Sequence, residues 1–320
     1  MLRLTLWLKR LADSSGGLRG RVSLFLLRRR HDLHWNYLRN PSSRRSFARQ
    51  RVALNAAQHQ VVRELRSEGV SLVSFTELGA DGNQLGRLRE TVDSFARSLK
   101  VKEAIRNYAA VVAQGQMAYD AYIVKLNVEG PTFALDNPLL QLGLDPQILG
   151  VVNSYLGLWS KLIYADVWHS IPIDVGRRIG SQRWHRDPED RKIVKIYLYF
   201  SNVDQGSGPL EYVPGSGFGG RYEKIRKWKA RGDRYPPDGE LESRIPASEC
   251  ISCVGPVGTT VFCDTSGFHR GGIATTSARI VATWTFCTPA AISVTARRRY
   301  TVDYGGRESE LSPAARFALT

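Results

Sequence analysis

Three side chains that favour transition metals stand in two short motifs of the sequence. His185 and Asp187 lie two residues apart in the first motif, and His269 lies in the second, a glycine-flanked loop expected just beyond a strand. Two neutral imidazoles and one carboxylate on one face of a metal leave three positions open, as in non-haem Fe(II) oxygenases. Each motif alone is weak, because the first pair suits a surface loop and His269 could be a buried core histidine. Their combination beside expected strands predicts a metal site.

Arg279 stands ten residues after His269, on the polar face of an expected strand. A guanidinium inside a barrel is costly unless it meets an anion, and its planar fork binds a carboxylate through two hydrogen bonds. The dicarboxylate 2-oxoglutarate would satisfy Arg279 with its far carboxylate while its 2-oxo acid end chelates the iron. The alternative is that Arg279 is only a charge at a strand edge.

The elements that must position these residues change in type near residue 160. Before it, apolar spacing predicts helices at 54–65 and 85–99, and a short strand is expected at 70–75. The pair Asp145-Pro146 predicts a further helix, because aspartate caps a helix and proline suits its first position.

Beyond residue 160, strand-like runs alternate with Gly/Pro turns. In one run Lys195 and Tyr197 share a face opposite Val194 and Ile196. One polar and one apolar face suit a barrel around a binding cavity, but a sandwich with solvent outside gives the same pattern. The expected strands are 161–168, 192–200, 210–213, 259–263 and 279–286.

The stretch from about residue 136 to 290 resembles the phytanoyl-CoA dioxygenase family of Fe(II)- and 2-oxoglutarate-dependent oxygenases, and upstream elements extend the resemblance to about residue 55. It is carried by DPQILGVVNSYLG, WHRD, GSGPLEYVPGSG and GPVGTTVFCDTSGFHRGG, with Arg279 following. The resemblance implies a mainly β fold with flanking helices, built on a double-stranded β-helix (a cupin-like jelly roll). It also implies Arg279 as the 2-oxoglutarate anchor. The implied iron ligands are His185, Asp187 and His269.

Two further residues are matched to cosubstrate contacts of the family. Lys125 corresponds to a lysine that contacts 2-oxoglutarate, and Tyr197 corresponds to an aromatic residue on a core strand. The alternative for Lys125 is a surface lysine. The chain departs from the family at Gly217, where a histidine is usual, and at Val281, where some relatives carry a hydroxyl or amide that helps to hold the cosubstrate.

These features together predict a 2-oxoglutarate-dependent dioxygenase that uses dioxygen to hydroxylate a small organic substrate, releasing succinate and carbon dioxide. Asp187 favours hydroxylation, because related halogenases lack this carboxylate and place chloride there. The alternatives are an iron oxygenase that does not use 2-oxoglutarate and a catalytically silent jelly-roll binding protein. The sequence does not indicate which small molecule is the substrate.

Composition and length place the chain among ordinary globular proteins. It has 320 residues, of which 42% are hydrophobic and 23% charged, and no apolar run approaches the length that spans a membrane. We expect a single oxygenase domain between two terminal segments. The expected parts are a basic arm (1–51), a domain (52–295) with helical support (52–157), a jelly-roll core (158–290) and an insertion (218–249), and a carboxy-terminal tail (296–320).

Most of the net positive charge lies in the basic arm. Residues 1–51 contain thirteen Lys and Arg against two acidic residues, which is +11 of the +15 carried by the whole chain. The rest of the chain is therefore not predicted to bind nucleic acid. The basic arm has three interpretations: a solvated tail, a segment that makes peripheral contact with an anionic membrane and, third, a segment that contacts nucleic acid.

Four cysteines in a chain of this length do not suggest a secreted disulfide framework, and a cytoplasmic location is the default expectation. Cys250 and Cys253 have the spacing of half a zinc site, but Cys263 and Cys287 are too far apart to complete it. We therefore expect structural thiols.

Overall fold

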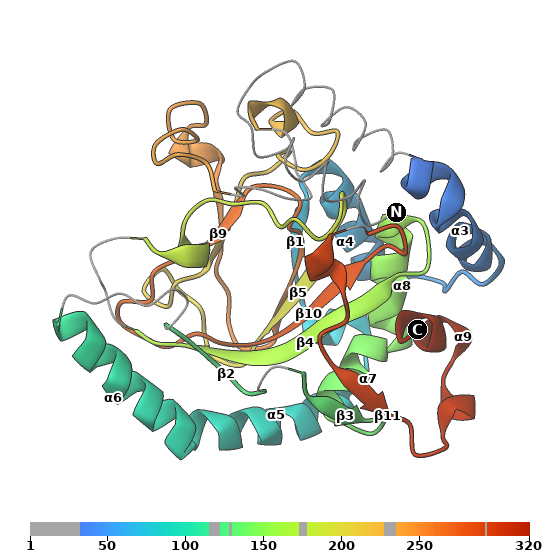
Figure 1. Cartoon of the computed structure of the whole chain (residues 1–320), viewed down its shortest axis with the longest axis horizontal. Coiled ribbons are helices and arrows are strands. Elements are labelled where there is room, and N and C mark those ends of the chain that lie inside the picture. Colours follow the sequence, from blue (N-terminus) through green and yellow to red (C-terminus); the bar gives the residue numbers. More distant parts are fainter. Residues whose placement is uncertain (1–32, 115–121, 128–129, 173–177, 227–234, 292) are drawn as a thin grey trace, which may run out of the picture.

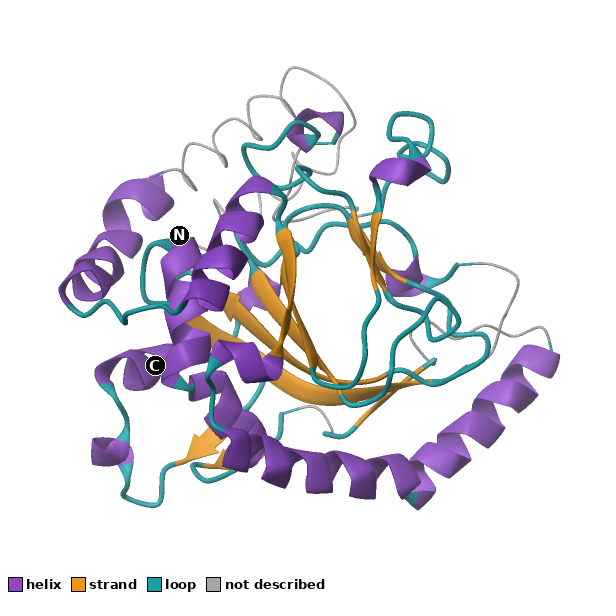
Figure 2. Cartoon of the chain, turned by 180° about the vertical axis from the view of Figure 1, so that it is seen from behind, coloured by secondary structure: helices purple, strands orange, loops and turns teal. Residues whose placement is uncertain are grey.

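Two antiparallel sheets face each other in the computed structural model, and helices cover the outer side of the larger sheet (Figure 1). The same layering is seen from behind in Figure 2, where most helices lie on one side of the large sheet. The structure describes residues 33–114, 122–127, 130–172, 178–226, 235–291 and 293–320. The predicted membrane contact of the basic arm falls largely on residues 1–32, outside the described residues.

The large sheet has six strands and the small sheet three. In spatial order the large sheet contains β1 (Val70–Ser74), β8 (Thr259–Asp264), β5 (Val194–Tyr199), β10 (Ile280–Cys287), β4 (Lys161–Ser170) and β2 (Ile123–Lys125). The small sheet contains β7 (Ile251–Cys253), β6 (Leu210–Tyr212) and β9 (His269–Gly271). A separate parallel pair joins β3 (Thr132–Ala134) to β11 (Thr301–Asp303).

The chain moves repeatedly between the two main sheets after β4. It runs through β5 in the large sheet, β6 and β7 in the small sheet, β8 in the large, β9 in the small and β10 in the large. Antiparallel strands wound in this way form a double-stranded β-helix. The predicted fold class is therefore confirmed, and the five expected strands beyond residue 160 all occur within two residues of their expected bounds.

The helices pack mainly on the outer face of the large sheet. The main helices are α3 (Asn40–Arg49), α4 (Ala56–Ser67), α5 (Gly82–Arg97), α6 (Leu99–Ala113), α7 (Pro138–Leu144), α8 (Pro146–Leu156) and α9 (Pro313–Ala318). A π-helical turn covers His34–Leu38, and 3₁₀ turns cover Phe75–Leu78, Gly180–Gln182, Glu223–Ile225, Ala247–Glu249, Val294–Ala296 and Glu308–Glu310. No helix in these described ranges is both long and apolar enough to cross a membrane.

The capping signal for α8 is confirmed. The Asp145 carboxylate accepts hydrogen bonds from the backbone N–H groups of Gln147 and Ile148, at 2.8 and 3.4 Å. Pro146 occupies the first helical position, and Gly157 ends the helix with a φ of 69°. Both ends of this helix are thus determined by local sequence.

The expected helix at 85–99 is wrong at its end. Helix α5 stops at Arg97, and Ser98 caps the next helix by accepting a hydrogen bond from the N–H of Val101. Leu99 consequently starts α6 and is 72% exposed, although its spacing matched the buried stripe of α5. Serine ends one helix and begins another here because its hydroxyl competes for backbone N–H groups.

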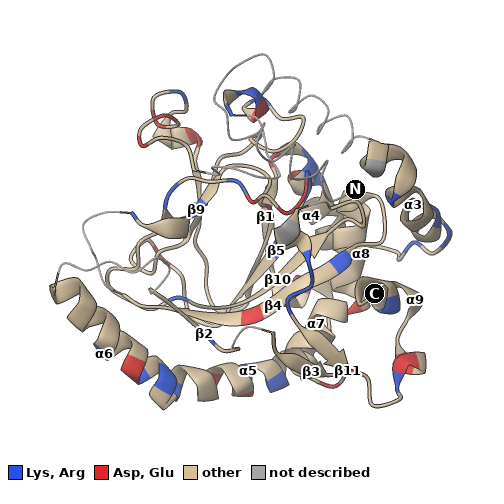
Figure 3. Ribbon diagram, viewed as in Figure 1, with Lys and Arg blue, Asp and Glu red and all other residues tan. Residues whose placement is uncertain are grey.

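Two faces of β5 serve two different cores. Val194, Ile196 and Leu198 belong to the cluster under the helices, whereas Tyr197 and Tyr199 belong to the cluster between the sheets. Both tyrosines are buried, so the inner face of the large sheet is not exposed to solvent. Figure 3 shows that charged residues lie mainly on helices and loops and are few on the strands.

Segments near both ends of the described chain pack on the domain. In α3, the Ser43 hydroxyl donates to the carbonyl of Trp159 at 2.6 Å, and the Asn40 side chain accepts from the N–H of Ala290 at 3.1 Å. At the other end Leu319 is buried in the helical core. These contacts join parts of the expected arm and tail to the body.

Close packing of α7 against β10 yields a stability prediction. A Cβ on Gly143 would lie 2.6 Å from Cδ1 of Trp284, whose indole N–H is held by the carbonyl of Leu139 at 2.7 Å. We expect Gly143→Ala to lower the free energy of unfolding by about 1–3 kcal/mol in urea titration, because the indole cannot retreat. The matched control Gly86→Ala, where a Cβ meets nothing within 4 Å, should be neutral or stabilising by up to about 1 kcal/mol. Equal stability of the two variants would contradict this packing.

Candidate metal centre

Backbone pairing brings the two histidine motifs together. His185 and His269 exchange N–H···O bonds of 3.0 Å in both directions, so the segment before Asp187 extends the small sheet next to β9. The N–H of Asp187 is held by the carbonyl of Thr265 at 2.9 Å. Because residues two apart on an extended chain share a face, His185 and Asp187 both point to the inside. His269, expected in a loop, is the first residue of a strand.

The three side chains converge on one point between the sheets. One ligand atom from each of His185, Asp187 and His269 lies within 4.8 Å of the others. The Nε2 atoms of the histidines are 3.9 and 3.6 Å from the carboxylate oxygens. All three residues are buried. These distances are too long for direct hydrogen bonds and short enough for shared ligation of one ion.

Hydrogen bonds on the far side of each ring define which nitrogen faces the carboxylate. Nδ1 of His185 lies 2.8 Å from the carbonyl of Arg183, and Nδ1 of His269 lies 3.0 Å from the carbonyl of Gly267. A carbonyl can only accept, so each Nδ1 carries a proton, and in the neutral form of each ring Nε2 presents a lone pair toward the carboxylate. Two lone pairs and a carboxylate thus face one another, an arrangement that fits a metal cation.

Lys195 is a charged neighbour of this centre that sequence reasoning did not assign to it. Its ammonium lies 2.6 Å from Oδ2 of Asp187. Burial alone would raise the pKa of Asp187, but the Lys195 ammonium and then the two imidazoles outweigh burial and hold that pKa below its usual range. The sequence places Lys195 on the inner face of its strand, but no spacing rule connects it to Asp187.

Arg279 and Tyr197 lie on the same inner face of the large sheet. Arg279 is 8% exposed, and within the described residues its Nε has no hydrogen-bond partner. A buried guanidinium nitrogen without a partner is unusual and fits an anion as ligand. Burial raises the pKa of Tyr197, and the charges that modify it include both Asp187 and Arg279. Tyr197 is therefore within electrostatic reach of Asp187, a candidate metal ligand, and of the Arg279 guanidinium.

Lys125 occupies the edge of the large sheet. It pairs with Trp168 across β2 and β4, so its side chain lies on the same side of the sheet as that indole. Trp168 in turn contacts Tyr197, with ring centroids 6.3 Å apart. Lys125 is exposed, whereas His185, Asp187 and His269 are buried.

The charge-rich insertion contacts His185, one of the three candidate metal ligands. The ring of Tyr235 lies 5.5 Å from that of His185, measured between centroids. Arg183 holds this part of the insertion through a 3.1 Å hydrogen bond from Nε to Asp238 and another, of 3.3 Å, to the carbonyl of Pro236. The sequence showed only that the insertion was charged, and Tyr235 carried no motif that could have identified it.

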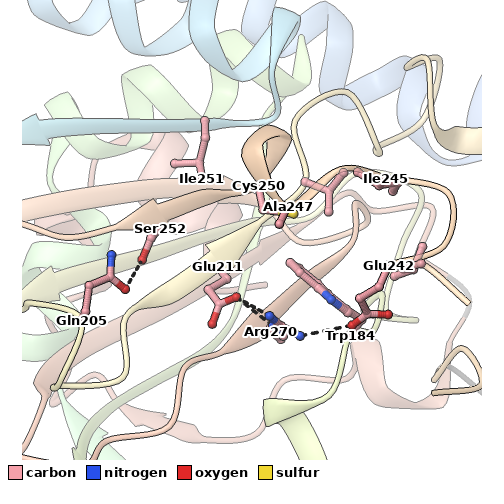
Figure 4. A pocket seen from close by; sticks show the side chains of 12 residues that line it. Trp184, Gln205, Glu211, Glu242, Ile245, Ala247, Cys250, Ile251, Ser252 and Arg270 are labelled. Carbon is pink, nitrogen blue, oxygen red and sulfur yellow. Dashed lines mark hydrogen bonds and ion pairs between the residues drawn. The ribbon is translucent and has the colours of Figure 1, made fainter. Parts of the chain in front are cut away.

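A separate hollow of about 330 Å³ lies on the other side of the small sheet. Figure 4 shows Arg270 in this hollow with its guanidinium directed at Glu211 and Glu242. Since His269 and Arg270 are consecutive on β9, their side chains point to opposite faces. The hollow is thus distinct from the metal centre.

The cysteines do not join the metal centre in the described part of the chain. All four are free, and Cys253, Cys263 and Cys287 are buried. Burial raises the pKa of the Cys253 thiol to about 12 and keeps it protonated. A protonated, buried thiol is a packing group and a poor metal ligand.

Comparisons with known proteins find likeness only among solved structures. No family model and no curated protein matches the chain, so membership of the phytanoyl-CoA dioxygenase family remains a prediction from motifs. The epimerase SnoN, solved with Fe3+, alpha ketoglutarate and nogalamycin RO, is 13% identical, with a TM-score of 0.46 over 75% of this chain and 89% of that one.

Two further similar structures are EctD from S. alaskensis with bound Fe and the non-heme alpha ketoglutarate dependent carbocyclase SnoK from nogalamycin biosynthesis. EctD is 14% identical, with a TM-score of 0.46 over 80% of this chain and 92% of its own. SnoK is 16% identical, with a TM-score of 0.44 over 82% of this chain and 95% of its own.

Proposed function

We propose that this chain is an Fe(II)- and 2-oxoglutarate-dependent dioxygenase that hydroxylates a small organic substrate. The observation that carries the proposal is the convergence of two imidazoles and the Asp187 carboxylate inside a β-helix, with the Nε of Arg279, on the same inner surface, having no hydrogen-bond partner among the described residues. This donor set suits ferrous iron with open positions for a chelating 2-oxo acid and dioxygen.

Each residue has a defined task in this proposal. His185, Asp187 and His269 hold the iron, and Arg279 receives the far carboxylate of 2-oxoglutarate through its planar fork. Iron with a chelating 2-oxo acid supplies the activation of dioxygen that oxidation of a C–H bond requires. The Tyr235 ring of the insertion packs against the ring of His185 and would help to keep water from a bound ion.

The reaction class is tested by oxygen-dependent formation of succinate. The full chain is incubated with Fe(II), ascorbate and 2-oxoglutarate in air. Succinate is measured by NMR, first without an added substrate and then with each member of a panel of small-molecule substrates. We expect slow basal release that rises with an accepted substrate and vanishes without oxygen or in His269→Ala. A catalytically silent binding protein would give no succinate. An oxygenase that does not use 2-oxoglutarate would oxidise the substrate without consuming 2-oxoglutarate.

The two less central cosubstrate residues are predicted to differ in effect. Tyr197→Leu should raise the 2-oxoglutarate concentration for half-maximal succinate release by about tenfold, because Tyr197 is buried and lies within the electrostatic reach of both Asp187 and Arg279. Lys125→Met should raise it by only about two- to threefold, because an exposed ammonium contributes little. An unchanged requirement in Tyr197→Leu would remove this residue from the site.

A further inference from the structure

Lys195 is placed where its charge must meet a neighbour. Its Cα pairs with Cys263 on one side and Thr285 on the other, in the middle strands of the large sheet. From there its side chain enters the space between the sheets, where it is 16% exposed. Lysine is seldom buried to this degree unless it is paired, because removing an ammonium from water is costly.

The partner is the carboxylate that the proposed function assigns to the metal. The 2.6 Å from the Lys195 ammonium to Oδ2 of Asp187 is a direct ion pair, and the Asp187 side chain is 4% exposed. The Lys195 ammonium therefore places a full positive charge in direct contact with Asp187.

We propose that Lys195 is a built-in counter-ion of Asp187, which stabilises the ligand carboxylate in the metal-free protein and weakens divalent metal binding by competing for it. The proposal rests on the metal site of the proposed function. A divalent ion ligated by Asp187 would bring its charge close to the Lys195 ammonium, and like charges repel strongly in a buried site. Lys195 is in this sense a residue that sets metal affinity, without being a ligand.

Metal affinity distinguishes this role from a merely structural one. The dissociation constant for Mn(II) is measured at pH 8 by calorimetry on the full chain. We expect Lys195→Met to bind Mn(II) about tenfold or more tightly than wild type, because the repulsion is gone. If Lys195 only supported the fold, Lys195→Met would bind Mn(II) as tightly as wild type or more weakly. That result would overturn the proposal.

Two control variants separate charge from shape. Lys195→Arg keeps the positive charge and should bind Mn(II) within about threefold of wild type. Lys192→Met removes a nearby lysine that lies over the ring of Tyr155 and should leave the affinity unchanged. Tightening in Lys192→Met as large as that in Lys195→Met would show a general effect of net charge and would contradict the proposal.

A double-mutant cycle on the metal-free protein tests the ion pair even if the wild-type chain binds no metal. Asp187→Asn and Lys195→Met are each expected to lower the unfolding midpoint by about 5 °C or more, because each leaves one buried charge unpaired. The double variant should have a higher unfolding midpoint than either single variant. Additive losses would refute the pairing, whereas absence of Mn(II) binding together with this coupling would refute only the proposed function. If Lys195→Met folds only when Mn(II) is present, the metal has replaced the missing charge as proposed.

Discussion

The His185→Ala variant is expected to bind Fe(II) at least about 100-fold more weakly than the wild-type chain, because one of the three proposed protein ligands is lost. Succinate release should fall in the same proportion at limiting iron. The measurement is iron content after anaerobic reconstitution and dialysis, read alongside far-UV circular dichroism.

A second histidine provides the control for that loss. His59 is exposed on α4, and His59→Ala removes an imidazole without touching the space between the sheets. This variant should retain as much iron as the wild-type chain. Equal iron content in His185→Ala and His59→Ala would show that the metal, if bound, is held elsewhere.

The Arg279→Leu variant is expected to raise the dissociation constant of 2-oxoglutarate by about 100-fold, since truncating one partner of a buried charge pair costs 2–5 kcal/mol. Iron binding should stay within about threefold of wild type, because the three ligands do not include Arg279. The split between the two affinities is what identifies an anchor for the cosubstrate. It is read from the visible charge-transfer band that forms when 2-oxoglutarate is titrated into the anaerobic Fe(II) protein.

Stability and a surface arginine serve as controls for Arg279→Leu. Removing a guanidinium whose buried Nε has no partner in the described part of the chain should not lower the unfolding midpoint of the ligand-free protein. Arg63→Leu changes an exposed arginine of α4 and should leave the 2-oxoglutarate affinity unchanged. If Arg279→Leu binds the cosubstrate as tightly as Arg63→Leu does, the anchor has been assigned to the wrong residue.

Local patterns predicted the parts of the fold in which neighbouring residues determine the geometry. The alternation at Lys195 and Tyr197 predicted the inner face of β5, and Asp145-Pro146 predicted the start of α8. The same logic failed at Leu99, where apolar spacing continued across a serine that ends one helix and caps the next. Hydrophobic period describes a helix face but does not reveal a break between two helices of similar period.

The candidate site divides in the same way. His185, Asp187 and His269 could be selected from residue type and spacing, and the structure brings their side chains together. The ion pair of Lys195 and the contact of Tyr235 with His185 could not, because both depend on strand register and on the course of a long insertion. Neither register across sheets nor the path of such an insertion is encoded in a short motif.

Locating a bound ion in a crystal tests the metal site most directly. The full chain would be crystallised with Mn(II), and anomalous scattering would be recorded at the manganese edge. The site proposed here predicts one dominant peak within about 2.5 Å of Nε2 of His185, Nε2 of His269 and a carboxylate oxygen of Asp187. No peak between these three side chains at saturating Mn(II), or a dominant peak held by other residues, would contradict it.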